Sequence, residues 1–330
     1  MTQLETLFFF EPYYKSVIWG GDKISALKRL VPAKTQIGES WEISAVPGHE
    51  SIVAQGDFKG TNITDLIKKF GPLLVGQHAF DTWGYTFPLL VKIIDAKENL
   101  SVQVHPDDSL ANELHNTKGK TEMWYVIDAE EDSKIFSGFS AKRNCPDVST
   151  LLENSSIVDS LASFSARKGE FYYIPAGTIH AIGAGTMVAE IQETSDISYR
   201  IYDYNRVDKS GEQRPLHIAN ASKALDFNSK DCGPIALPSS TELGVVESEF
   251  FKIDFYKPEG NVSAVHKRAH DSFSIIMAVH GDLECKIGEK DFLIRKGSTA
   301  LVPACVKEYL ICAHAPYLIV SMPSPSGSDE

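Results

Sequence analysis

The sequence predicts an all-β protein with short helical insertions, and three observations support this fold class. The apolar runs are short, rich in β-branched and aromatic residues, and separated by Gly and Pro. Residues 168–181 have the order strand, Pro-Gly turn, strand, which is typical of antiparallel sheets. Residues 296–305 repeat the pattern of residues 168–177 almost position for position. This repeat predicts a second β-barrel in the same chain.

The N-terminal part of the chain combines strands with one helix. Residues 61–70 have the pattern of a helix that is capped by Thr61 or Thr64, and the Gly-Pro pair at 71–72 would end it. Residues 87–94 form a nearly continuous apolar run, which predicts a central strand. Lys92 is the one polar side chain on that strand, and we expect it to face a polar cavity.

Further helices are expected only in the connections between strands. Residues 108–116 fit a helical turn, and residues 149–165 fit one or two helices outside the barrel. Residues 186–204 predict one long strand whose register is interrupted near Ser195. Residues 217–226 predict a helical connector, and strands are expected again from about residue 243.

A short alternating segment at residues 101–108 places Gln103 and His105 on one face of a strand. Pro106 ends the strand directly after the histidine. An amide oxygen and an imidazole at this separation offer two metal ligands. Alone, the pattern also fits a half-buried strand with a solvated polar face.

Two later segments add a carboxylate and a second imidazole. Glu122 begins an aromatic and β-branched strand, where an unpaired carboxylate is costly unless a cation lies near it. His180 follows the Pro-Ala-Gly turn at 175–177, from which it can point across a barrel toward Gln103 and His105. One amide, one carboxylate and two imidazoles suit a catalytic zinc with an open coordination position. A solvated strand start for Glu122 and a satisfied core histidine for His180 are the alternatives.

The composition and charge indicate which partners and which cellular compartment to expect. The 330 residues are 43% hydrophobic and carry a net charge of −12, which argues against nucleic acid and anionic membrane surfaces as partners. No apolar run approaches the roughly 20 residues that span a bilayer, and no basic region precedes the short apolar run near the N-terminus. The five cysteines are scattered and form no C-x-x-C pair, which argues against a disulfide framework. We therefore expect a soluble cytoplasmic protein.

Several sequence runs carry a family resemblance. The runs are SVQVHPDD, GKTEMWYV, IPAGTIHAIGAG and YRIYDYNR, together with WGG at 19–21 and GESWEIS at 38–44. They resemble the signature segments of the type I mannose-6-phosphate isomerases, in their short bacterial form, within the cupin superfamily. The resemblance implies two cupin (jelly-roll) β-barrels, with a metal-binding catalytic domain at residues 1–225 and a C-terminal cupin-like domain at residues 226–330. Because the repeat has no histidine where His180 would fall, the second domain is expected to lack metal ligands.

The resemblance also implies a metal and a reaction. One Zn²⁺ per chain would be held by Gln103, His105, Glu122 and His180. The substrate would be a small sugar phosphate, because the family interconverts mannose 6-phosphate and fructose 6-phosphate. A proton would move between C1 and C2 through an enediol(ate), whose charge the metal stabilises as a Lewis acid.

The expected catalytic residues are Arg200 and Lys120, and the expected substrate-binding residues are Lys120, Arg200, Ser101 and Glu193. Lys120 is two residues before Glu122 and should share its face, with a surface lysine in a hairpin as the alternative. For Arg200, the alternative is a structural ion pair with Asp196 or Asp203. The general base is open among Lys120, a zinc-bound water and Glu193.

Three further points remain open. Longer relatives usually carry a polar residue before the lysine, where this chain has Gly119, so a proton relay through that position is in doubt. A cupin with His and carboxylate ligands can also bind iron and activate oxygen, so a dioxygenase is an alternative, as is a non-enzymatic sugar-binding protein. The sequence indicates no oligomeric state.

Overall fold

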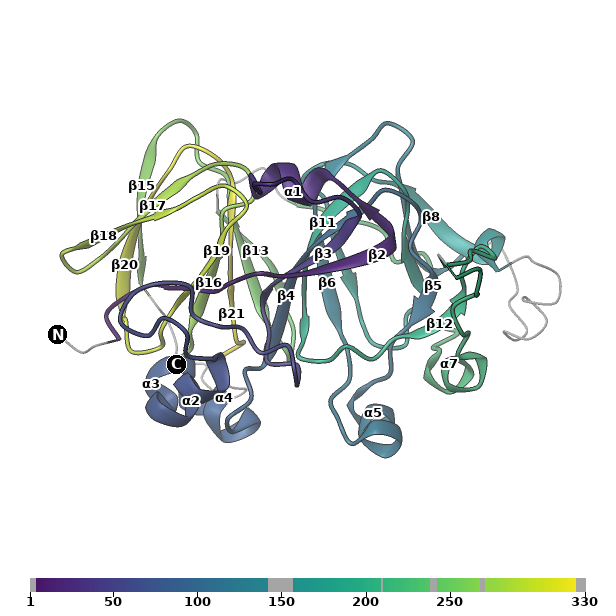
Figure 1. The fold of residues 1–330 in the computed structure, drawn as a ribbon, viewed down its shortest axis with the longest axis horizontal. Helices are drawn as coiled ribbons and strands as arrows, with labels where there is room; N and C mark the ends of the chain where they lie inside the picture. The colour runs from purple at the N-terminus through teal and green to yellow at the C-terminus, as the bar shows by residue number, and fades with distance from the viewer. Residues whose placement is uncertain (1–3, 142–156, 209, 238–241, 268–270, 325–330) are drawn as a thin grey trace. The chain divides into compact units, whose positions relative to one another are not determined.

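The computed structural model describes residues 4–141, 157–208, 210–237, 242–267 and 271–324 (Figure 1). In these parts of the chain, strands form four sheets and the helices are short, which confirms the prediction of a mostly β protein. No helix in the same residues is long and apolar enough to cross a membrane.

The closed barrels predicted from the sequence are not found. Each of the four sheets in the described residues is open, because its two outermost strands do not pair with each other. The contacts divide the chain into two compact units, one of residues 1–13, 41–91 and 236–330 and one of residues 14–40 and 92–235. The second unit holds the segments that carry the expected site. The assignment of residues 1–225 and 226–330 to two functional domains stays a prediction.

Two sheets make up most of the second unit, residues 14–40 and 92–235. The six-stranded sheet has the order β2 (Tyr13–Gly21), β3 (Ile37–Ile43), β4 (Leu89–Ala96), β11 (Thr186–Glu193), β6 (Glu122–Ala129) and β9 (Phe171–Ile174). The five-stranded sheet has the order β12 (Tyr199–Tyr202), β5 (Val102–Val104), β10 (His180–Ile182), β7 (Lys134–Phe139) and β8 (Leu161–Ser165). The connections include α1 (Lys23–Leu27), α5 (Asp108–His115), the 3-10 helix η1 (Val158–Ser160) and α7 (Ile218–Ala224).

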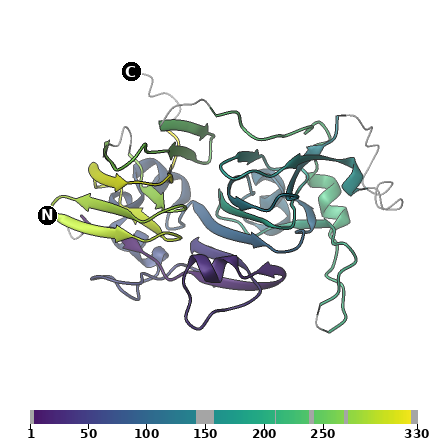
Figure 2. The same cartoon turned by 90° about the horizontal axis from the view of Figure 1, so that it is seen from above.

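The two sheets of this unit pack face to face, as Figure 2 shows from above. One buried cluster joins Trp124 and Val188 of the six-stranded sheet to Ile135 and Ile182 of the five-stranded sheet. A second cluster covers the outer face of the five-stranded sheet, where Ala221 of α7 packs in it. The six-stranded sheet therefore has a buried inner face, and its polar side chains there need partners.

The first unit contains the other two sheets. Its six-stranded sheet has the order β1 (Phe8–Phe9), β19 (Thr299–Val302), β16 (Ser274–Met277), β21 (Tyr317–Ser321), β14 (Lys252–Tyr256) and β13 (Glu242–Glu247). Its four-stranded sheet has the order β15 (Val262–Lys267), β20 (Glu308–Ala313), β17 (Leu283–Ile287) and β18 (Lys290–Ile294). Helices α2 (Ile63–Phe70), α3 (Pro72–Val75) and α4 (Gln77–Trp83) belong to this unit.

The internal repeat seen in the sequence is confirmed as a repeat of topology. The order β4-β11-β6-β9 in one unit matches β14-β21-β16-β19 in the other, and β5-β10-β7-β8 matches β15-β20-β17-β18. The repeated sequence falls on equivalent strands, because β9 and β19 occupy the same position in the two orders. Each strand of one copy can therefore be aligned with a strand of the other.

Most predicted elements are present, and the differences have local causes. The predicted helix at 61–70 is α2, but its N-cap is Asn62 and not Thr61 or Thr64. The single strand predicted for residues 186–204 is wrong. It is two strands in two different sheets, β11 and β12, because the chain leaves the first sheet after Glu193.

The helices predicted for residues 149–165 are wrong in the part that the structure describes. Residues 149–156 lie outside the described residues, and after η1 the chain forms β8 at the edge of the five-stranded sheet. Leu161 there pairs with Phe139 of β7, so pairing with a neighbouring strand decides the structure of a segment whose own pattern also fits a helix.

The cap of α2 can be tested by mutation. The Asn62 side-chain oxygen accepts the Asp65 backbone N–H at 2.8 Å, and this bond satisfies one of the free donors at the start of the helix. Asn62→Ala should therefore lower the free energy of unfolding by about 1 kcal/mol in urea titrations. Thr64→Ala is the control, and an equal or larger loss in that variant would contradict Asn62 as the cap.

Candidate metal centre

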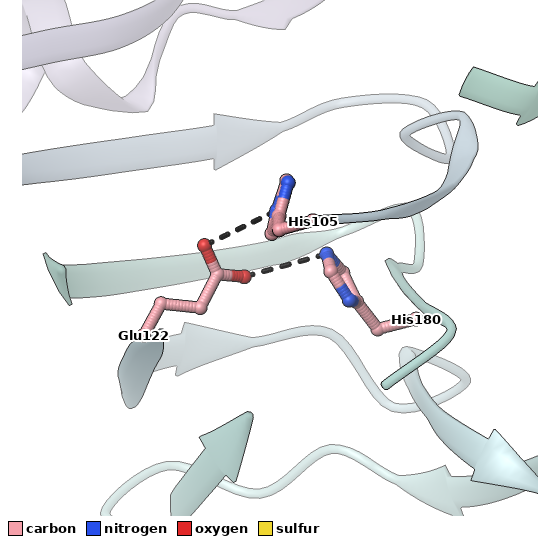
Figure 3. Close-up of side chains that lie close together, drawn as sticks. All are labelled: His105, Glu122 and His180. Carbon is pink, nitrogen blue, oxygen red and sulfur yellow. Dashed lines mark ion pairs between the residues drawn. The ribbon is translucent and has the colours of Figure 1, made fainter. Parts of the chain in front are cut away.

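Three chain segments bring His105, Glu122 and His180 together in the interior of the second unit (Figure 3). His105 directly follows β5, Glu122 is the first residue of β6 and His180 is the first residue of β10. The Nε2 atoms of His105 and His180 each lie 3.4 Å from a different oxygen of the Glu122 carboxylate. In the described residues, this is the one group of three or more His, Cys, Asp or Glu side chains whose ligand atoms lie within 4.8 Å of one another.

Backbone hydrogen bonds hold these three segments in place. The His105 carbonyl accepts the Gly177 N–H at 2.9 Å, which ties the end of β5 to the turn before His180. The Pro106 carbonyl accepts the Lys120 N–H at 3.0 Å, which ties the same loop to the start of β6. The convergence of the three side chains thus follows from main-chain contacts between segments far apart in the sequence.

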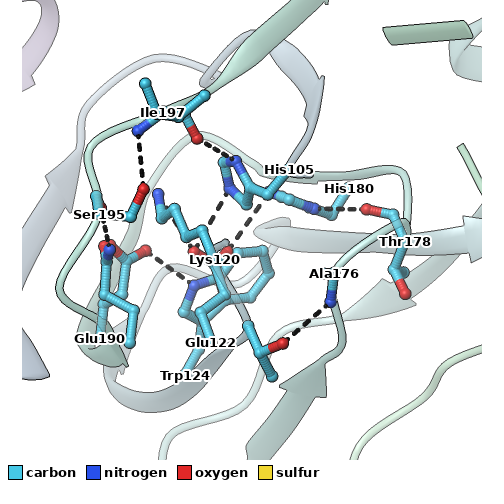
Figure 4. A network of polar contacts seen from close by, with 12 residues as sticks. His105, Lys120, Glu122, Trp124, Ala176, Thr178, His180, Glu190, Ser195 and Ile197 are labelled. Atoms are coloured by element: carbon cyan, nitrogen blue, oxygen red, sulfur yellow. Dashed lines mark hydrogen bonds and ion pairs between the residues drawn. The ribbon is translucent and has the colours of Figure 1, made fainter. Parts of the chain in front are cut away.

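Both imidazoles are oriented by backbone carbonyls (Figure 4). His105 Nδ1 lies 3.0 Å from the Ile197 carbonyl oxygen, and His180 Nδ1 lies 2.8 Å from the Thr178 carbonyl oxygen. Since a carbonyl only accepts, each Nδ1 must donate, so in the neutral ring Nε2 carries a lone pair. The two lone pairs face the oxygens of Glu122.

The Nε2 atoms of His105 and His180 and the oxygens of Glu122 are all acceptors, so no hydrogen bond can form between them. A bound cation would fit among them. Both Nε2 atoms and both carboxylate oxygens of Glu122 are buried and have no hydrogen-bond partner. Buried polar groups are almost always satisfied, and a metal ion is one way to satisfy four acceptors at once. The donor set of two imidazoles and one carboxylate is that of a catalytic zinc site.

The pKa shifts of His105, His180 and Glu122 favour the protonation states in which these residues can bind a metal ion. Burial lowers the pKa of His105 to about 3, with a further contribution from the charge of Lys120. Burial also lowers the pKa of His180. Burial alone would raise the pKa of Glu122, but the charge of Lys120, whose Nζ lies 3.3 Å away, lowers it well below its usual range. The centre therefore consists of two neutral imidazoles and an ionised carboxylate.

A cavity of about 280 Å³ opens beside this group, and four of the expected site residues line it. They are Ser101, Gln103, Lys120 and Arg200. The other lining residues are Lys15, Val17, Trp19, Glu39, Lys92, Ile94, Leu100, Glu190, Asp196, Ser198 and Arg214. Gln103 pairs in register with His180 on one side and with Arg200 on the other, and it lines the cavity.

Glu190, which lines the cavity, forms a polar network with Trp124 and Lys92 that the sequence analysis did not assign to the site. Lys92 Nζ donates to Glu190 Oε1 at 3.0 Å and to Gln192 Oε1 at 2.7 Å, and Trp124 Nε1 donates to Glu190 Oε2 at 3.0 Å. The indole of Trp124 meets the His180 ring edge to face, with 5.3 Å between ring centroids. Lys92 lines the cavity as expected. The alternating face of β11 that carries Glu190 and Gln192 was the available signal.

The predicted residue Glu193 lies apart from the cavity lining. It is buried, and its Oε1 accepts the Thr121 N–H at 2.8 Å. Burial, together with the nearby charge of Asp108, raises the pKa of Glu193 to about 8, although the Thr121 hydrogen bond opposes the shift. Glu193 is therefore largely protonated at neutral pH.

Gly119 is packed against the loop that follows His105. A Cβ atom built on Gly119 would lie 2.6 Å from the carbonyl carbon of Asp107 and from the amide nitrogen of Asp108. Both atoms belong to the backbone, so no side-chain rotation can relieve the overlap. A polar side chain therefore does not fit at this position, and no proton relay passes through one.

Comparison with known proteins places the chain in a family. A model of the catalytic domain of type I phosphomannose isomerase matches residues 7–134. A mannose-6-phosphate isomerase of Bacillus subtilis is 31% identical to this chain over 94% of the chain and 97% of its own length. A mannose-6-phosphate isomerase of Streptococcus mutans is 32% identical over 92% of the chain and 94% of its own length. The chain belongs to the type I mannose-6-phosphate isomerase family. The family resemblance inferred from the sequence is therefore confirmed.

Solved structures agree with the membership of the isomerase family. The crystal structure of the mannose 6-phosphate isomerase from Bacillus subtilis superposes with a TM-score of 0.82 at 33% identity, covering 96% of this chain and 99% of that one. A variant of phosphomannose isomerase from Salmonella typhimurium gives a TM-score of 0.74 at 15% identity, covering 96% and 99%, and supports the fold alone.

The ionisation of Glu193 leads to a prediction about stability. The folded chain keeps a proton on this carboxyl between its usual pKa of 4.5 and about 8, whereas the unfolded chain loses it near 4.5. Stability should therefore fall as pH rises through this window, by up to about 1 kcal/mol per pH unit. Glu193→Gln keeps an oxygen for Thr121 and cannot ionise, so its urea unfolding midpoint should fall less between pH 5 and pH 8.

The exposed residue Glu113 on α5 provides the control for this measurement. Glu113→Gln should retain the decline in stability of the parent chain. An unchanged pH dependence in Glu193→Gln would mean that the Glu193 carboxyl is ionised throughout.

Proposed function

We propose that the protein is a zinc-dependent aldose-ketose isomerase that interconverts mannose 6-phosphate and fructose 6-phosphate. One observation carries the proposal: buried ligand atoms of two histidines and a glutamate, which have no hydrogen-bond partner, lie beside a cavity lined by lysines and arginines in a chain of this family. The relatives that match nearly the whole chain are named mannose-6-phosphate isomerases. The implied substrate is a small anionic sugar phosphate.

His105, Glu122 and His180 would hold one Zn²⁺, with Gln103 as the fourth ligand. Gln103 is supported by its place on β5, two residues before His105 on the same face of the strand. When bound, zinc would supply Lewis-acid stabilisation for the oxyanion that forms as the substrate loses a carbon-bound proton. The carbonyls of Ile197 and Thr178 would keep both imidazoles in the tautomer that presents Nε2.

The charged cavity wall suits an anionic substrate. Lys120 and Arg200 line the cavity, and Ser101 adds a hydroxyl to the same wall. Charge-assisted hydrogen bonds from such groups bind phosphate oxygens strongly even in a protein of negative net charge. We assign these three residues to substrate binding, and Arg200 also to charge stabilisation during the reaction.

Lys120 is the residue best placed to move the proton between C1 and C2. Its ammonium lies 3.3 Å from the Glu122 carboxylate and on the cavity wall at the same time. It therefore joins the metal ligands to the space for the substrate. Glu193 is less well placed, because the Thr121 N–H binds it and it does not line the cavity.

The two units correspond in this proposal to two cupin jelly rolls, only one of which keeps a metal site. The register of the repeated strands aligns Glu122 with Ser274 and His180 with Glu308, since both pairs occupy equivalent places in the sheets. Gln103 aligns in the same way with Lys267, whose Nζ lies 3.6 Å from Glu308 Oε2. An exposed ion pair thus replaces two ligands in the C-terminal copy.

Loss of one imidazole tests the metal and the activity together. His180→Ala should lower bound zinc from about one per chain to near zero. It should also lower the isomerase rate at least about a hundredfold, because the Lewis acid contributes several kcal/mol. Metal analysis and a coupled assay with mannose 6-phosphate, with and without added zinc, measure the two effects.

His115→Ala is the matched control for this experiment, because His115 on α5 contacts the hydroxyl of Tyr199 and lies outside the ligand group. It should keep both zinc and activity. Full isomerase activity after exhaustive chelation would contradict the metal role. Oxygen uptake by the iron-loaded protein without isomerase activity would favour a dioxygenase instead.

Substitution of Lys120 tests its part in proton transfer. Lys120→Met should lower kcat for mannose 6-phosphate at least about a hundredfold, which is the usual contribution of a positioned acid or base. Lys118→Met, which removes a half-buried lysine bound to Asp108, is the control and should leave kcat unchanged. Zinc content is measured in both variants, because Lys120 also neutralises Glu122. A Lys120→Met variant with unchanged turnover would dismiss the role.

A further inference from the structure

An ion cluster outside the metal centre orients a second arginine at the cavity wall. The Asp203 side chain is buried, and its two oxygens accept Nε of Arg214 at 2.8 Å and Nη2 of Arg214 at 2.6 Å. Arg206 donates to the same carboxylate and also to the Asn99 carbonyl. Burial alone would raise the pKa of Asp203, but the hydrogen bonds from Arg214 and Arg206 lower it. Asp203 therefore stays ionised and holds two guanidinium groups.

Of the two arginines bound to Asp203, one lines the cavity and the other does not. Arg214 lines the cavity, whereas Arg206 is not part of its lining. The paired hydrogen bonds from Nε and Nη2 fix the plane of the Arg214 guanidinium and leave Nη1 for another acceptor. Arg214 is thus a preoriented hydrogen-bond donor at the cavity.

Arg200 lies close enough to Arg214 for the two charges to interact. Burial lowers the pKa of Arg200, and the charge of Arg214 lowers it further. Arg200 donates Nη1 to the Pro215 carbonyl at 2.8 Å, while its Nε is buried and has no hydrogen-bond partner. Two mutually repelling cations with unused donors at one cavity wall are suited to an anion with several oxygens.

We propose that Arg214, held in place by Asp203, binds the phosphate group of the substrate together with Arg200. This inference rests on the proposed isomerase function and deepens it. Arg214 is a phosphate-binding residue, and Asp203 is a positioning residue that acts only through it. The recognised chemical group is a phosphate monoester dianion, since the planar guanidinium groups can each donate to its oxygens.

The experiment compares Arg214→Ala with Arg206→Ala in the zinc-loaded protein. Both variants remove one partner of Asp203, but only the first removes a donor from the cavity wall. Arg214→Ala should raise KM for mannose 6-phosphate, and the inhibition constant of inorganic phosphate, by about tenfold or more, because a charge-assisted hydrogen bond is lost. Its kcat should change much less. Arg206→Ala should leave both constants within about twofold of the parent.

Two further variants keep the test informative if Arg214→Ala fails to fold. Arg214→Lys keeps the charge but loses the paired hydrogen bonds, so it should weaken phosphate inhibition partly. Asp203→Asn should weaken it as well, because it releases the guanidinium. An unchanged phosphate constant in the Arg214 variants, or an equal loss in Arg206→Ala, would overturn the proposal.

Calorimetric titration with inorganic phosphate separates this inference from the proposed isomerase function. If the parent chain lacks isomerase activity but binds phosphate through Arg214, the isomerase assignment fails and the binding site stands. If the parent chain is an active isomerase and Arg214→Ala binds phosphate as the parent does, the inference on Arg214 fails and the isomerase assignment stands.

Discussion

The Glu122 carboxylate, buried between two imidazole nitrogens, is the interaction on which the rest of the site depends. Its oxygens and both Nε2 atoms are acceptors at 3.4 Å with no hydrogen between them. Such an arrangement is costly in a protein interior unless a cation is shared among the groups. The sheet registers, the backbone bonds from Gly177 and Lys120, and the carbonyls behind the rings all maintain it. The fold thus holds these buried acceptors close together.

Around this centre, buried carboxylates bind the lysines and arginines that line the cavity. Glu190 bridges Lys92 and the indole of Trp124, and Asp203 bridges Arg214 and Arg206. The protein has a net charge of −12, so long-range attraction of an anion is weak. Binding of a phosphorylated sugar would depend on these few oriented donors.

The sequence predicted the parts of the structure whose signals are local. The strands that carry His105, Glu122 and His180, the helix before Gly71 and the internal repeat were all visible as patterns. The sequence did not predict the features that depend on pairing between distant segments. The edge strand β8, the chain exit after Glu193 and the network around Glu190 each depend on neighbours that a single sequence does not reveal. Arg214 was missed because it lies in a turn-rich connector.

Gly119 couples the conformations of two segments of the site. Its missing side chain lets the segment that leads to Lys120 contact the backbone of Pro106, Asp107 and Asp108, which follow His105. The segment before Lys120 and the loop after His105 are therefore in direct contact, and neither can change its conformation without the other. A side chain at this position would require the loop after His105 to move. Substitution of Gly119 should thus require a compensating change in that loop, because the two segments are in direct backbone contact.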